Sequence, residues 1–144
     1  MAYCTLDDIK TNRIPEETLV MLTDDGNLGV VDTAVVAGAI SDADEVIDGF
    51  ARGRYPLPLN PVPGIVRTWS MDIATYGLYG RRPAFEPPKT VADRYATALK
   101  LLEKVQDGKF KLTDDEPVIT VEPVSVGEVL PATRVFTRDN LKGF

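Results

Sequence analysis

Residues 47–59 constrain the fold of this chain more than any other stretch of its sequence. A long amphipathic pattern ends there at two glycines, and the chain then enters a run of closely spaced prolines. Glycine weakens a helix, and proline cannot continue one because it lacks the backbone N–H and its ring clashes with the preceding turn. The segment therefore predicts a rigid structural corner formed by Gly49, Arg52, Arg54, Tyr55, Pro56 and Pro58.

The amphipathic pattern before this corner predicts the main helix, over residues 33–54. Its apolar residues recur every three or four positions and so share one stripe; they are Val36, Ile40, Ala43, Ile47 and Phe50. The acidic residues are expected mostly on the other side: Asp42, Asp44, Glu45 and Asp48. Asp32 is well placed to cap the helix, since its carboxylate can accept hydrogen bonds from unpaired N–H groups.

Further helices are predicted over residues 15–22, 63–79 and 90–107. Capping boxes are expected at residues 5–8, before a short first helix, and at residues 90–93, while Pro15 suits the first position of the second helix. Between the main helix and the next, the spaced prolines favour an extended polyproline path over the core. The predicted fold class is all-α: a small helical bundle of three main helices plus short N-terminal helices.

The composition changes after Leu112. An acidic, proline-containing linker is followed by two short β-prone runs, which Pro123 and Gly127 interrupt. The chain is therefore expected to divide into a helical core, residues 1–112, and an extended C-terminal arm, residues 113–144. Aromatic and arginine residues dominate many interfaces, so the expected partner-binding residues are Arg134, Phe136, Arg138, Leu141 and Phe144. The sequence leaves open whether the arm lies on a partner, a neighbouring subunit or its own core, and whether it adds a strand or stays irregular.

Residue types for catalysis are scarce. The chain has no histidine, which removes the commonest general base and the most frequent transition-metal ligand. Cys4 is the single cysteine, and it is expected to be a small buried apolar group rather than a nucleophile. The acidic cluster at residues 24–27 resembles a calcium loop only in part, because position twelve is Val35. We expect no enzyme activity, cofactor or metal; a carboxylate–metal enzyme is the alternative that a metal-content measurement would reveal.

The charge of the chain also limits its partners. A net charge of −6 disfavours binding of nucleic acid by a basic face, although it suits a wall past which DNA slides, or simple solubility. Four arginines are expected to pair with carboxylates rather than phosphates: Arg52, Arg54, Arg81 and Arg82. Trp69, Tyr76 and Tyr95 are expected in the core. The absence of a signal peptide pattern and of long apolar runs predicts an intracellular protein without a membrane span.

Several motifs, in order along the chain, resemble the head-tail connector, or head-completion, family of Mu-like phages and prophages. They lie at residues 3–9, 47–59, 62–63, 72–81, 95–102 and 136–144. Each motif is short, but together they follow one another over most of the chain with the right gaps.

The resemblance implies a small helical adaptor that forms a ring, commonly of twelve copies, beneath the portal protein of a tailed phage. Such a ring extends the DNA channel, through which genomic DNA passes without sequence-specific binding, and offers a platform for the stopper or tail. The protein would act in the neck of the virion after assembly in the host cytoplasm, with its arm on the portal and no catalytic residue. The alternative is a non-enzymatic monomeric protein-binding module of phage or bacterial origin.

Overall fold

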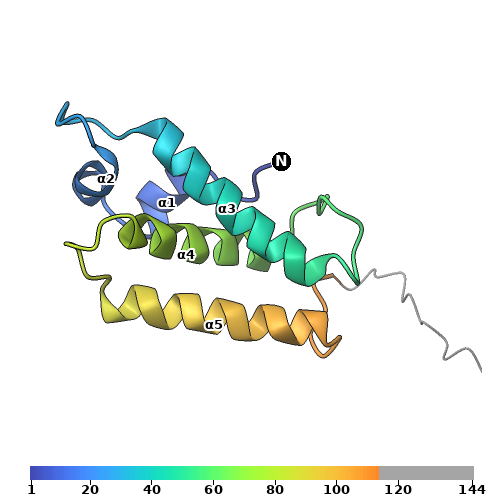
Figure 1. Ribbon diagram of the computed structural model, residues 1–144. Helices are drawn as coiled ribbons and strands as arrows, with labels where there is room; N and C mark the ends of the chain where they lie inside the picture. Colours follow the sequence, from blue (N-terminus) through green and yellow to red (C-terminus); the bar gives the residue numbers. More distant parts are fainter. Residues whose placement is uncertain (114–144) are drawn as a thin grey trace, which may run out of the picture.

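The computed structural model describes residues 1–113, which form five α-helices (Figure 1). These are α1 (Leu6–Asn12), α2 (Glu16–Thr23), α3 (Thr33–Ala51), α4 (Gly64–Gly80) and α5 (Lys89–Gln106). The predicted all-α class, with three main helices and two short N-terminal ones, is confirmed for this part of the chain. The expected arm, residues 113–144, lies outside the described residues except for its first one.

Helices α1 and α3 begin at side-chain caps, whereas α2, α4 and α5 each begin after a proline. Thr5 and Asp8 form the expected capping box before α1, and the Asp32 carboxylate accepts hydrogen bonds from Ala34 and Val35 at the start of α3. Pro15 lies at the N-cap of α2 rather than inside it. The predicted capping box at residues 90–93 is wrong: α5 begins earlier, after Pro88, and no side chain caps it. The extended backbone of Pro88 ends the preceding loop there, which places Thr90 inside the first turn.

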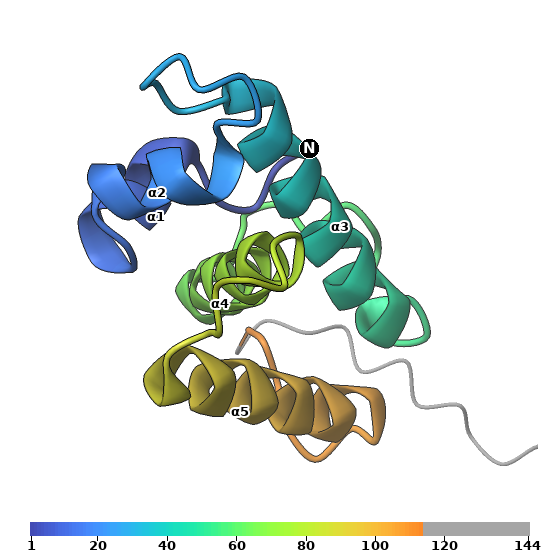
Figure 2. The same ribbon diagram turned by 60° about the vertical axis from the view of Figure 1, so that its left-hand side comes forward.

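Helix α4 lies at the centre of the bundle. It packs against α3 on one side and α5 on another, while α1 and α2 cover a further side (Figure 2). Ten of its residues are therefore buried, among them Val66, Trp69 and Leu78. Helix α3 turns its predicted stripe toward α4, and Val36 and Ile47 are almost fully buried. Each such side chain contributes about 1.5–3 kcal/mol through removal of apolar surface from water.

The connection from α3 to α4 differs from the predicted extended path. Helix α3 ends at Ala51, and the N–H groups of both Arg54 and Tyr55 bond to the Ala51 carbonyl in a turn. Residues 55–61 then bend repeatedly, and the Leu57–Pro58 and Asn60–Pro61 peptide bonds are cis. Burial of Leu59 explains the bending: its side chain enters the core and its N–H donates to the Tyr3 hydroxyl.

Candidate functional site

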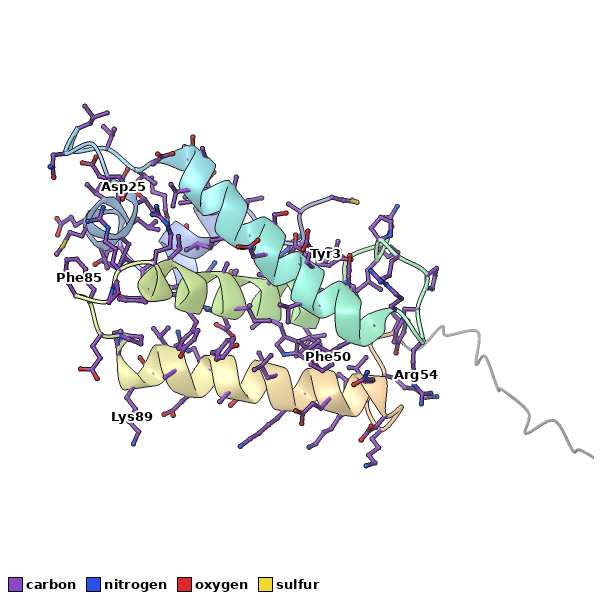
Figure 3. All side chains as sticks on the ribbon, viewed as in Figure 1. Tyr3, Asp25, Phe50, Arg54, Phe85 and Lys89 are labelled. Atoms are coloured by element: carbon purple, nitrogen blue, oxygen red, sulfur yellow. The ribbon has the colours of Figure 1, made fainter. Side chains whose placement is uncertain are left out.

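The corner after α3 contacts the end of α5. Arg54 Nε donates a 2.9 Å hydrogen bond to the Gln106 carbonyl, which lies among the unpaired carbonyls at the C-terminus of α5 (Figure 3). A cation at that position also interacts favourably with the helix dipole. The Tyr55 hydroxyl accepts a 3.0 Å bond from the Leu112 N–H. The corner therefore fixes the point from which the chain continues into the expected arm.

The remaining corner residues have simpler positions. Gly49 and Arg52 are exposed, and a Cβ atom built on Gly49 would meet no atom within 4 Å. Pro56 is exposed and Pro58 precedes the buried Leu59. The five expected partner-binding residues of the arm lie outside the described residues: Arg134, Phe136, Arg138, Leu141 and Phe144.

A buried polar network joins the N-terminal segment to α3 and α4. The Asp44 carboxylate accepts a 2.9 Å bond from the Tyr3 N–H and a 2.6 Å bond from the Ser70 hydroxyl, which also lies 3.2 Å from the Cys4 sulfur. Asp48 accepts a short bond from the Tyr3 hydroxyl. The expectation that Asp44 lies on the outer side of α3 is wrong, because α4 and the N-terminal segment cover it.

The burial of this network changes the acidity of its members. Loss of solvation raises the pKa of Tyr3 to about 12, with a further contribution from the bond to Asp48, and raises that of Cys4 to about 11. Burial also raises the pKa of the Asp44 carboxyl. Tyr3 and Cys4 therefore keep their protons near neutral pH, and Cys4 is the buried apolar group that was expected. Such a network stabilises the fold rather than transferring protons near neutral pH.

Besides this network, the fold contains a largely buried ion pair that the sequence did not predict. Arg13 Nε lies 2.5 Å from Asp72 Oδ1, and both side chains are largely removed from solvent. Amphipathic periodicity places Asp72 on the buried side of α4, among apolar residues, but it cannot identify a partner 59 positions away. The pair holds the end of α1 against α4.

The turn between α2 and α3 is fastened by arginines from the end of α4. Arg81 and Arg82 both reach the Asp25 carboxylate, at 2.7 and 2.6 Å, as expected for arginines that pair with carboxylates. Arg81 also donates to the Leu22 carbonyl, and Arg82 to the Asp24 carbonyl. In Figure 3, Asp25 lies in this turn above the end of α4.

A groove of about 410 Å³ lies where α3, α4 and α5 meet, and we call it the tyrosine groove. Its walls include Val35, Gly38, Val46, Tyr76, Gly77 and Tyr95. The Tyr76 and Tyr95 rings are stacked, with centroids 4.1 Å apart. The prediction that both tyrosines are core residues is correct only in part, since both are half-buried at the groove wall, whereas Trp69 is fully in the core.

Two helical glycines keep this groove open. A Cβ atom on Gly38 or Gly77 would meet no atom within 4 Å, so the fold itself does not require glycine at either position. Glycine inside a helix costs about 1 kcal/mol relative to alanine. No sequence pattern identified this groove, because its residues come from three separate helices.

A second groove, of about 560 Å³, lies between the N-terminal segment and α3, and we call it the acidic groove. Its lining includes the carboxylates of Asp44, Glu45 and Asp48. Within residues 1–113, no group of three or more potential ligands is arranged to hold a metal ion. None of the described helices is long and apolar enough to cross a membrane.

Comparison with known proteins places this chain among phage proteins. Residues 3–126 match the model of a family described as "Bacteriophage Mu, Gp36". The Mu-like prophage FluMu protein gp36 of Haemophilus influenzae is 32% identical over 114 residues, which cover 79% of this chain and 78% of that protein. Gene product J of Escherichia phage Mu is 31% identical over 110 residues, covering 76% and 74% respectively.

Proposed function

The chain belongs to the Mu gp36 family of phage and prophage proteins, and on that premise we propose that it is a head-tail connector. The proposed protein forms a ring, commonly of twelve copies in such adaptors, beneath the portal. The ring extends the DNA channel and provides the platform for the stopper or tail. The family match over residues 3–126 carries the proposal, because it spans the helical core and includes five of the six motifs that resemble connector proteins.

The corner supports this role. A subunit that tiles a ring needs its arm to leave the core at a fixed position. The Arg54 guanidinium donates to the Gln106 carbonyl and the Tyr55 hydroxyl accepts from the Leu112 N–H, and these two bonds hold residues 106–112 in place. We propose that the arm then binds the portal through Phe136, Leu141 and Phe144, with Arg134 and Arg138 adding charged contacts. Anchors of these types each contribute about 2 kcal/mol to many interfaces.

The net charge of −6 is consistent with a channel component. Like charge between a channel wall and the DNA phosphates prevents adhesion, so that DNA passes through without sequence-specific binding. The proposed role is non-enzymatic, and it needs neither a cofactor nor a metal. The proposed location is the neck of the virion, after assembly in the host cytoplasm.

A truncation tests the role of the arm. Deletion of residues 131–144 should leave helical circular dichroism and the urea midpoint unchanged, because the described core ends before this segment, while binding to immobilised portal should be lost. Val121→Ala, within the arm but outside the deleted segment, is the matched control and should bind normally. Portal binding by the truncated chain would contradict the proposed arm contact.

Light scattering of the full chain, with and without portal, tests the ring itself. A mass that corresponds to many copies on the portal is the expected result. A protein that stays monomeric under both conditions would contradict the connector proposal and favour the monomeric binding module.

A further inference from the structure

The tip of the turn between α2 and α3 presents aliphatic side chains to solvent. Leu28 is 78% exposed and Val30 is 59% exposed. The six residues from Gly26 to Val31 carry no charge, in a chain that is otherwise rich in acidic residues. We call residues 26–31 the loop tip.

The loop tip is held in position although the Leu28 and Val30 side chains are exposed. The Asp24 carboxylate accepts bonds from the N–H groups of Leu28 and Gly29, at 2.9 and 2.7 Å, and these bonds lower the pKa of Asp24. Gly29 adopts a φ of +73°, which favours glycine. Asp25 is held by two arginines of α4. The nearby carboxylates are thus occupied within the subunit, and the tip itself is both preorganised and uncharged.

The tyrosine groove has the complementary character. Most of its lining residues are apolar; Asp42 and Arg81 are the charged exceptions, and Arg81 already pairs with Asp25. Val46 remains 38% exposed in its wall, and the free space around Gly38 and Gly77 leaves it open without serving the fold. A groove of this volume is large enough for one or two aliphatic side chains. The subunit therefore carries an exposed apolar projection and an apolar recess that its own projection does not fill.

We propose that Leu28 and Val30 of one copy insert into the tyrosine groove of the next. The acidic groove is a poorer receptor, because its lining contains three acidic residues and no basic side chain, whereas the tyrosine groove has one acidic residue, Asp42, and the basic Arg81. Aliphatic side chains in the acidic groove would remove water from these carboxylates without pairing them. In a ring, each copy would offer its projection to one neighbour and its recess to the other, which is a head-to-tail contact. This inference rests on the proposed ring and specifies the contact between its subunits.

Three variants of the full chain separate this contact from folding. Leu28→Asp places a charge on the projection and leaves the groove intact. Gly38→Gln fills the groove; because its Cβ has free space, the urea midpoint should be unchanged or raised. Gly49→Gln is the matched control, since Gly49 is also an exposed glycine of α3 with free space around its Cβ, but it does not line the groove.

Nuclear magnetic resonance titration reads the contact directly, even when it is weak. The ¹⁵N-labelled Leu28→Asp chain, mixed with unlabelled Gly38→Gln chain, should show shifted amides at Gly38, Gly77 and Val46. These two chains have only one intact projection and one intact groove between them, so the complex should stop at one copy of each. When unlabelled Leu28→Asp chain is added instead, the dissociation constant from these amide shifts should be at least about thirtyfold higher. Gly49→Gln should associate like the wild-type chain.

The outcomes distinguish the contact from the connector role. Groove shifts in the mixed titration support the contact. The contact is overturned if the mixed titration shows no shifts, or shifts only at the acidic groove or another surface. This holds whether or not the wild-type chain forms a ring. A wild-type ring without groove shifts would remove the contact and leave the connector. Groove shifts without a ring, alone or with portal, would keep the contact and remove the connector.

Discussion

Replacement of Asp44 by alanine tests whether the buried network anchors the N-terminal segment. The carboxylate is 7% exposed and accepts hydrogen bonds from the Tyr3 N–H and the Ser70 hydroxyl. A hydrogen bond to a charged group contributes about 1.5–3 kcal/mol, so two amount to about 3 kcal/mol at the low end of that range. Removal of a desolvated carboxylate offsets part of this loss. We expect a net decrease of about 2 kcal/mol in the free energy of unfolding near neutral pH.

The pH dependence provides a second, independent signature. Burial raises the pKa of Asp44, so the folded state binds this proton more tightly than the unfolded chain does. The stability contributed by this group is fully present below the pKa of the unfolded chain and is lost as pH rises through the folded pKa. The alanine variant lacks this titration. The difference in stability between wild type and variant should therefore widen as pH falls from about 7 to about 4.

Urea unfolding followed by helical circular dichroism measures both effects. Glu45→Ala is the matched control, because this residue is the exposed neighbour of Asp44 on α3, and it should change stability by less than about 0.5 kcal/mol. Asp44→Asn keeps one acceptor oxygen and should fall between wild type and alanine. The proposed anchoring would be refuted if Asp44→Ala lowered the free energy of unfolding as little as Glu45→Ala does. It would also be refuted if the stability difference between wild type and Asp44→Ala narrowed as pH falls.

Three further predictions concern other contacts within the fold. Arg13→Ala leaves the Asp72 carboxylate buried without a cation and should lower the free energy of unfolding by about 3 kcal/mol; a pair of apolar replacements at both positions should lose much less. Gly108→Ala should lower the free energy of unfolding in urea by more than about 1 kcal/mol, because φ is +74° and a Cβ would lie 2.5 Å from the Arg54 guanidinium. Adding Arg54→Ala to this variant should recover only the part of the loss that the steric clash causes. Cys4, with its pKa raised from 9.0 to about 11, should react with iodoacetamide near pH 8 about a hundredfold more slowly than in urea; equal rates would contradict its burial.

Periodicity predicted the helices but not the polar interior. The stripe of Val36, Ile40 and Ile47 could be recognised because spacing along one helix determines which side chains share a face. The burial of Asp44 could not, since a helix has no marked inner face until its neighbours are in place. Tyr3 and Ser70 become its partners only when the N-terminal segment and α4 pack against α3.

The corner illustrates the same division. Glycine and proline predicted that α3 must end near residue 54, because their backbone preferences are local. The path after it was predicted wrongly, since insertion of Leu59 into the core bends the chain at several positions. The contact of Arg54 with the end of α5 spans 52 residues and has no local signature.

Sequence alone therefore determined the all-α class, the approximate helices, the scarcity of catalytic residue types and the resemblance to phage connectors, since each depends on residue identity and spacing along the chain. Tertiary structure alone decided which acidic residues are buried, how the corner holds the end of α5, and that a groove opens among three helices. The physical reason is that burial, pairing and open space depend on atoms far apart in sequence. The loop tip and the tyrosine groove belong to this second group, and their proposed contact depends on how separate subunits meet.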